Sequence, residues 1–511
     1  MMGNPGFQRD TGTIVRLPID NPTLPLLLMV LGDFRRQAIS YCYWKSGKRI
    51  QSVLAGEGDL DLLIARRDQH RAQAILLGHG FKLFPSVAMR DHPSILSYLG
   101  YDEPSGRLIH LHLHFHLVVG ERLHKNYRIP WEAEILARAI PHPNLTVKVL
   151  DPSSEAVLLG VRACLELGRL DPVTLRGWQK TLARFELDRK QLAETLDRAQ
   201  LIGRASELLG DDLGAMLADA IYGAGPFDQS GRLRRAIQEH FAPYRAYNAL
   251  EARLRSAARA IHWAAGSLNK SFLHLPRPWS RRAPGGGCVV ALIGIDGSGK
   301  TTVSASIRAW LSSEMDVMPV YFGTGGGRPS LLLRPFKSIV PLLTLLLKTK
   351  PRGSSHGKIS KDDPGLLYSL LLMVWAAVVA REKRTKLLAT YRSASRGLVV
   401  VTDRYPQNEI RGFNDGPLLT RLAWAPSWLR RWEVNTYALA QRLPPDLVIK
   451  LIVRPETTAR REPDMDPTVI EKRIEEIPRL AFSGAHIASI NAEQPLVDVI
   501  RAVKQEIWRM L

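Results

Sequence analysis

Hydrophobic and polar residues alternate most regularly at residues 108–117, which read LIHLHLHFHL. Every second position in this stretch is a histidine, giving His110, His112, His114 and His116. Successive side chains of a β-strand point to opposite faces. The alternation therefore predicts a strand with imidazoles on one face and leucine and phenylalanine side chains on the other.

Shorter patterns place this strand in an α+β region that covers residues 1–147. The runs ISYCYWKS and DLDLLIA predict further strands, and DQHRAQAILLGHGF predicts a helix that ends near Gly78 or Gly80. From residue 148 to residue 274 the pattern becomes helical and rich in Ala, Leu, Arg and Glu, with Ser153 or Ser154 as the expected N-cap.

The pattern changes again after a Pro-, Gly- and Arg-rich linker at residues 275–287, LPRPWSRRAPGGG. The runs CVVALIGI, GLVVVT and DLVIKLIV that follow are almost continuously apolar, as in strands buried on both faces of a parallel sheet. Helical patterns separate them. Residues 288–511 are therefore expected to form a doubly wound α/β domain, and the chain as a whole belongs to the α/β class.

Two apolar segments raise the question of membrane contact. Residues 366–380, LLYSLLLMVWAAVVA, are apolar but shorter than the roughly 20 residues that cross a bilayer, so a buried helix is expected. Residues 331–350 mix leucines with basic residues inside an insertion at 330–363. This composition leaves peripheral membrane contact open as an alternative to packing on the domain.

The charge balance favours anionic partners. The 511 residues include 70 Lys and Arg against 49 Asp and Glu, which gives a net charge of +21. Nucleic acid is not expected, because no recognised nucleic-acid motif accompanies the charge. Cys42, Cys164 and Cys288 form no CxxC pair, and no signal peptide is visible, so we expect a cytoplasmic protein. A homodimer remains an open possibility.

The strongest chemical signal is GIDGSGKT at residues 294–301, which fits the pattern G-x-x-x-x-G-K-[ST]. It follows a predicted strand and precedes a helical pattern, which is the context that a phosphate-binding loop requires. Glycines let backbone N–H groups converge on phosphates, Lys300 would neutralise their charge, and the Thr301 hydroxyl would bind Mg²⁺. The expected ATP-binding residues are Gly294, Asp296, Gly297, Ser298, Gly299, Lys300, Thr301 and Thr302.

Two further stretches supply residues for phosphoryl transfer. GLVVVTDRYP places Asp403, Arg404 and Tyr405 at the carboxyl end of a buried strand, where ligands bind in open α/β sheets. Asp403 is expected to hold Mg²⁺, and Arg404 to grip a phosphate in bidentate fashion. Arginines that follow DLVIKLIV, among them Arg461, are suited to covering the transferred phosphoryl group.

Together these stretches resemble the thymidylate kinase family of P-loop nucleoside-monophosphate kinases. The matching segments are IGIDGSGKTT, LLLMVWAAVVAREKRTKLLATYRSASRGLVVVTDRY and PDLVIKLIVRPETTARRE. The resemblance implies an ATP- and Mg²⁺-dependent phosphotransferase that acts on a nucleoside monophosphate or a related phosphorylated acceptor. Its implied catalytic residues are Lys300, Asp403, Arg404 and Arg461, and its implied acceptor contacts are Arg381, Arg404 and Tyr405, with Arg384 replacing Arg381 if the register shifts.

The N-terminal region has a resemblance of its own. Asp59 and Asp61 lie two apart on a predicted strand in AGEGDLDLLIARRD, which resembles the Asp-x-Asp motif of the nucleotidyltransferase superfamily. That resemblance implies metal ligation by both carboxylates and places His110 where a third carboxylate belongs. We therefore expect His110 or His112 to lie close to the aspartates, in a domain that is active, degenerate, or structural and metal-binding. A nucleotide-binding regulator or scaffold remains the alternative for the whole chain.

Overall fold

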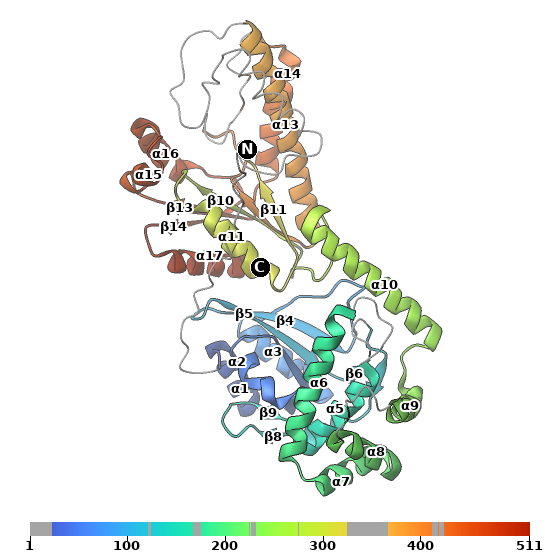
Figure 1. Cartoon of the computed structure of the whole chain (residues 1–511). Coiled ribbons are helices and arrows are strands. Elements are labelled where there is room, and N and C mark those ends of the chain that lie inside the picture. Colours follow the sequence, from blue (N-terminus) through green and yellow to red (C-terminus); the bar gives the residue numbers. More distant parts are fainter. Residues whose placement is uncertain are drawn as a thin grey trace, which may run out of the picture.

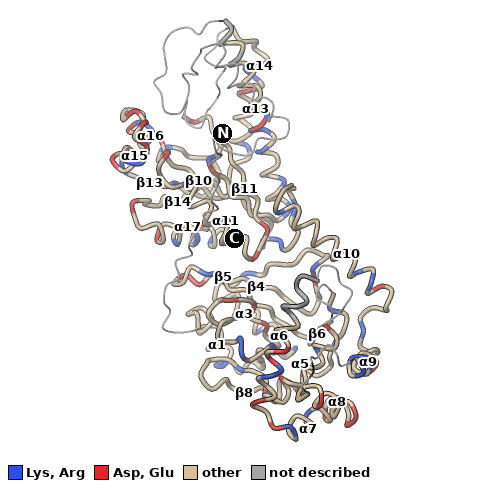
Figure 2. Tube along the Cα trace, viewed as in Figure 1, with Lys and Arg blue, Asp and Glu red and all other residues tan. Residues whose placement is uncertain are grey.

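The computed structural model describes residues 23–120, 124–166, 175–223, 225, 231–273, 275–323, 366–410, 417, 419 and 424–511. Two halves follow one another along the chain, and helix α10 (Ala249–Leu268) runs beside both of them (Figure 1). The expected insertion at 330–363, with the basic and apolar stretch 331–350, lies outside the described residues. In Figure 2, Lys and Arg positions are spread along both halves.

The first half is built on a seven-stranded mixed sheet of order β3-β4-β5-β2-β1-β9-β8. Helices α1 (Pro25–Arg36), α2 (Ile50–Leu54) and α3 (Gln69–Gly78) belong to this half, and their buried residues share one core with Leu111 and Leu113. The predicted strands and the helix ending at Gly78 are confirmed. The strands are β1 (Tyr41–Tyr43), β2 (Asp59–Ile64), β3 (Lys82–Leu83), β4 (Ile95–Asp102), β5 (Arg107–His114), β8 (Ile140–Pro141) and β9 (Lys148–Val149).

The alternating pattern of residues 108–117 is explained by this sheet. Strand β5 pairs in parallel with β2, with Asp59 opposite His110 and Asp61 opposite His112. The leucines between the histidines are fully buried in the core, so the histidines occupy the opposite face of the strand, as predicted.

The helical region follows as predicted, but its first cap differs. Helix α5 (Pro152–Glu166) is capped by Asp151, whose carboxylate accepts a hydrogen bond from the Ser154 N–H at 3.1 Å. The prediction of a Ser153 or Ser154 cap is wrong, because Asp151 directly precedes the helix and both serines are buried in its first turn. The other helices here include α6 (Leu175–Thr195), α7 (Arg198–Leu209), α8 (Asp211–Tyr222) and α9 (Gly231–His240).

Residues 275–287 form a packed strap instead of a free linker. Arg281 forms an isolated β-bridge with Ser86 of the first half. The N–H groups of Trp279 and Ser280 donate to the Asp316 carboxylate of the second half at 2.8 and 2.6 Å. Trp279 is buried. The strap is therefore attached to both halves.

The second half contains a five-stranded parallel sheet of order β11-β12-β10-β13-β14. Every residue from Cys288 to Ile293 of β10 is buried, which requires cover on both faces. Helices α11 (Lys300–Ser312) and α17 (Leu496–Met510) pack on each other, as do α13 (Leu366–Ser395) and α14 (Ser427–Arg442). The strands are β10 (Cys288–Gly294), β11 (Val317–Tyr321), β12 (Val399–Asp403), β13 (Leu447–Ile452) and β14 (His486–Asn491).

The apolar run at 366–380 forms the first half of α13, which contacts β10, β11 and β12. Met373, Ala376, Val379 and Ala380 are buried, in agreement with the predicted buried helix. Among the residues that the structure describes, no helix combines the length and the apolar character needed to cross a membrane.

We expect Leu292→Ala to destabilise the second half by about 2–5 kcal/mol, because this side chain is fully buried at the centre of the parallel sheet. Hydrogen exchange of β10 and β13 peptides would measure the change in opening free energy. Val497→Ala, at a position that is 46% exposed, should leave exchange unchanged. Equal protection in both variants would contradict the assigned core.

Candidate functional site

The loop between β10 and α11 carries the glycine-rich motif. Its backbone turns through left-handed conformations at Gly297 (φ 80°) and Gly299 (φ 88°), which glycine adopts without a steric penalty. Helix α11 begins at Lys300, directly after the second of these residues. The loop therefore lies over a helix N-terminus, where unpaired N–H groups and the helix dipole favour an anion.

The strand order places this loop where ligands commonly bind in open α/β sheets. Strand β10 lies between β12 on one side and β13 on the other. The chain thus continues to opposite sides of β10, and ligands of open α/β sheets bind outside the carboxyl ends of strands at such a switch point. Asp403 ends β12, opposite Leu292 of β10. Helix α15 (Pro455–Arg461) follows β13.

One carboxylate connects the cations of this loop. Oδ1 of Asp296 lies 3.6 Å from Lys300 Nζ and 2.5 Å from Arg404 Nη2. Lys300 is buried and also donates to the Ile295 carbonyl at 2.7 Å. Burial lowers the pKa of Lys300, and the Asp296 charge opposes this effect. The arrangement concentrates positive charge beside the loop and holds it in place.

The residues expected to hold Mg²⁺ are adjacent. The Thr301 hydroxyl donates to Oδ2 of Asp403 at 3.4 Å. Oδ1 of Asp403 is buried and has no hydrogen-bond partner within the described part of the chain. Burial raises the pKa of Asp403, while Lys300 and Arg404 oppose the rise. Hydroxyl and carboxylate oxygens are suitable ligands for Mg²⁺, so this pair of residues fits the ion.

Of the remaining predicted residues, the structure places Arg461 at the loop and the others away from it. Arg461 lies at the loop, where its Nη1 donates to the Gly297 carbonyl at 2.8 Å. Tyr405 lies in the core with its hydroxyl donating to the Leu443 carbonyl, a structural position that stands against the expected acceptor contact. Arg381 and Arg384 are exposed on α13, and no interaction found among the described residues joins either to the loop.

Sequence reasoning missed Arg473. Its Nη1 lies 3.7 Å from Oδ2 of Asp296, on helix α16 (Pro467–Arg479). No motif marks this arginine, because α16 reaches the loop only through the tertiary fold. The sequence feature that could have indicated Arg473 is its position as a basic residue in the helix that follows α15.

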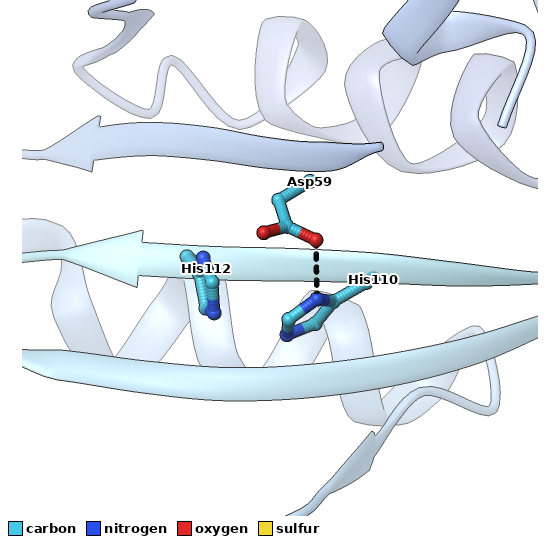
Figure 3. Close-up of side chains that lie close together, drawn as sticks. All are labelled: Asp59, His110 and His112. Atoms are coloured by element: carbon cyan, nitrogen blue, oxygen red, sulfur yellow. Dashed lines mark hydrogen bonds and ion pairs between the residues drawn. The ribbon is translucent and has the colours of Figure 1, made fainter. Parts of the chain in front are cut away.

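A second cluster lies in the first half, on the histidine face of β5. His110 Nδ1 donates to Asp59 at 2.6 Å, and Figure 3 shows these side chains with His112 beside them. Asp61 accepts from His112 at 3.2 Å and from His114 at 2.9 Å. The expectation that His110 or His112 lies close to the aspartates is confirmed. His116 points elsewhere and pairs with Glu132 at 2.9 Å.

The electrostatics of this cluster favour neutral His110 and His114 beside ionised aspartates. Burial lowers the pKa of His110 to about 4 and that of His114 to about 3, although the neighbouring aspartates oppose these shifts. Burial alone would raise the pKa of Asp61, but Lys45 and the hydrogen bonds from His112 and His114 hold it well below its usual range. Neutral imidazoles and carboxylates are potential metal ligands.

This cluster borders a cavity of about 820 Å³ between the two halves. Asp59, His110 and His112 line it from the first half, and Glu314 lines it from the second. Oε2 of Glu314 lies 3.3 Å from His110 Nδ1. No sequence pattern predicted this contact, because it joins residues far apart in the chain.

The fold and the loop define the second half as an α/β domain with a parallel sheet whose central strand leads into a Gly-Lys-Thr loop. A stretch of 221 residues, 42% of this chain, is 31% identical to the uncharacterized ATP-binding protein YghS of Escherichia coli (strain K12) and covers 90% of it. The chain belongs to the family of that protein. The uncharacterized ATP-binding protein YghR of the same strain is 25% identical over 229 residues, which cover 43% of this chain and 86% of YghR. No protein-family model matches the chain.

A half-buried carboxyl supports the Lys45-Ser46-Gly47 turn beside β1. Oε1 of Glu155 accepts a hydrogen bond from the Gly47 N–H at 2.8 Å. Burial raises the pKa of Glu155 to about 7, and the hydrogen bond from Gly47 opposes this rise. The folded state thus holds a proton that the unfolded state releases near the ordinary value of 4.5.

We expect the stability contributed by protonated Glu155 to be present below pH 4.5 and to be lost as the pH rises towards about 7. Glu155→Gln keeps an acceptor for Gly47 but cannot ionise. Thermal unfolding between pH 5 and pH 8 should show a smaller decrease for this variant than for the wild type. Parallel pH profiles would contradict the raised pKa.

Proposed function

We propose that the protein is an ATP- and Mg²⁺-dependent phosphotransferase resembling thymidylate kinase. Its acceptor would be a nucleoside monophosphate or a related phosphorylated molecule. The observation that carries the proposal is the buried, unpartnered oxygen of Asp403 beside Thr301 and Lys300 at the glycine-rich loop. A hydroxyl, a carboxylate and an ammonium group at a helix N-terminus form a suitable environment for the phosphates of a nucleotide and their metal ion.

ATP as the donor is supported by two independent observations. The loop has the backbone conformation and the helix N-terminus that a polyphosphate requires. YghS and YghR, the relatives described above, are both named ATP-binding proteins. In this chain the phosphates would displace the Ile295 carbonyl as the partner of Lys300.

The proposed reaction needs positioning and charge more than a strong base. An oxygen of the acceptor phosphate attacks the γ-phosphorus, the bond from that phosphorus to the β–γ bridging oxygen breaks, and ADP leaves. Lys300 would neutralise the β- and γ-phosphates. Thr301 and Asp403 would hold Mg²⁺, which when bound would help to neutralise the phosphate charge.

The arginines beside the loop would bind the acceptor phosphate and stabilise the transferred group. Arg404, at the end of β12, would turn from Asp296 to grip the acceptor phosphate, where its planar group can form two parallel hydrogen bonds. Arg461 lies against Gly297 and would stabilise charge on the transferred group. Arg381 is exposed on α13, so a shift of this helix or a different conformation of the Arg381 side chain would be needed to bring it to the acceptor.

A nucleotide-binding regulator is the second candidate. It is favoured by the positions of Tyr405, which is buried in the core, and of Arg381, which is exposed on α13. Such a protein would bind ATP at the same loop without passing the phosphoryl group to a small molecule. Incubation with γ-labelled ATP and a panel of nucleoside monophosphates and phosphosugars separates the two candidates.

We expect Lys300→Ala to reduce phosphoryl transfer by on the order of 100-fold or more, because it removes a buried charge from developing phosphate charge. Transfer of label from γ-labelled ATP to the acceptor would be measured at saturating Mg²⁺. Arg308→Ala, which removes a positive charge at an exposed position of the same helix outside the loop, serves as the control. Wild-type turnover in a folded Lys300→Ala variant would refute the proposal.

Arg404→Ala should raise the KM for the acceptor at least about 10-fold more than the KM for ATP, because the lost contact is a charge-assisted, bidentate one. Steady-state kinetics with each substrate varied in turn would measure this ratio. Arg473→Ala is the matched control, since Arg473 also approaches Asp296 and is similarly exposed. If both variants change the two KM values alike, Arg404 acts through Asp296 and not on the acceptor.

A further inference from the structure

The cavity between the halves contains donors that the proposed phosphoryl transfer does not use. Asp59 and His110 come from neighbouring strands of the first half, and Glu314 follows α11 in the second. Nδ1 of His110 lies 2.6 Å from Asp59 Oδ1 and 3.3 Å from Glu314 Oε2. Two carboxylate oxygens from different halves thus converge on one imidazole nitrogen.

His112 adds a second imidazole to this group. Its ring centre lies 4.1 Å from that of His110. Asp59, His110 and His112 each offer a ligand atom, and these atoms all lie within 4.8 Å of one another. Figure 3 shows the three side chains turned towards the same space above β5. Small movements would bring them to the distances of about 2.0–2.2 Å at which Zn²⁺ binds nitrogen and oxygen.

We propose that Asp59, His110, His112 and Glu314 form a site for a divalent transition metal, such as Zn²⁺, that joins the two halves of the protein. Two imidazoles and two carboxylates make a four-coordinate N₂O₂ set whose two negative charges balance the ion. Imidazole ligands favour Zn²⁺ and similar ions over Mg²⁺. This site therefore differs in metal and ligands from the pair of aspartates expected from the nucleotidyltransferase resemblance.

Access from solvent distinguishes the proposed metal site from the neighbouring group of Asp61, His112 and His114. Asp61, His112 and His114 also lie close enough to share an ion, but His114 is fully buried and packs edge-on against Trp44. Asp59, His110, His112 and Glu314 all line the 820 Å³ cavity. An ion can reach the proposed site through this cavity without disturbing the core.

The cluster also has an electrostatic reason to bind a cation. The carboxylates of Asp59 and Glu314 approach the same nitrogen, and like charges at this separation repel. Arg281 partly offsets this: it donates to the Glu314 main-chain carbonyl at 2.5 Å and lies 3.5 Å from the carboxylate. The main-chain contact can persist when the carboxylate turns to the metal. Binding through Nδ1 of His110 would move its proton to Nε2.

The position of Glu314 gives the metal site a structural consequence. Glu314 is two residues beyond α11, and α11 begins at Lys300 in the glycine-rich loop. A metal held by both halves would fix the far end of this helix to β5. Metal binding would therefore protect the end of α11 and strand β5 from hydrogen exchange together.

Calorimetric titration of the chelator-treated full chain with Zn²⁺ tests the proposal. We expect one ion per chain, with affinity at least 10-fold weaker in His112→Asn and in Glu314→Gln. His116→Asn is the matched control, because His116 is 19% exposed against 18% for His112 but pairs with Glu132 outside the cluster. Co²⁺ should give the visible absorption of a four-coordinate site in the wild type and lose it in His112→Asn.

Different results would overturn the metal site itself or only its connection between the two halves. No Zn²⁺ binding to the wild type, or equal losses in His112→Asn and His116→Asn, would overturn the site. Weakened binding in His112→Asn with wild-type binding in Glu314→Gln would overturn the connection between the halves. Because His112 and Glu314 are both partly exposed, each variant should fold, and circular dichroism would verify this. None of these measurements depends on phosphoryl transfer.

Discussion

The burial of β10 on both faces is the constraint on which the second half depends. A strand with no exposed edge or face can offer side chains or backbone groups to a ligand only at its ends. At the carboxyl end of β10, its neighbours β12 and β13 end on either side of it. The glycine-rich loop occupies that end. Asp403 from β12 and Arg461 after β13 reach the same point because parallel neighbours end at the same edge of the sheet.

The charged side chains at the glycine-rich loop are arranged around Asp296. The carboxylate lies beside Lys300, Arg404 and Arg473, so one negative charge holds these cations near one another. An isolated cluster of buried positive charge would be costly. The aspartate lowers that cost and keeps the side chains in position. A phosphate group that binds at this loop would then compete with Asp296 for partners that are already oriented.

Local sequence patterns predicted strands and helices well, but they did not predict contacts between distant segments of the chain. The alternation of residues 108–117 predicted β5 and its histidine face, because a strand's period of two is visible in the sequence. The continuous apolar runs predicted the parallel sheet for the same reason. The predicted serine cap was wrong because Asp151, two residues before Ser153, accepts the hydrogen bond from the first turn of the helix. Glu314 and Arg473 reach their sites through tertiary packing, and no nearby motif marks them.

The strap at residues 275–287 has a further consequence for the cavity. Its attachment to Ser86 on one side and Asp316 on the other keeps the two halves from diffusing apart. Groups tethered in this way meet at a high effective concentration, so even weak contacts between them form without an extensive interface. The walls of the cavity can therefore include many charged and polar side chains among the apolar ones, because the strap acts together with the apolar contacts of Phe84 and Tyr101 with Trp508 to hold the two halves together.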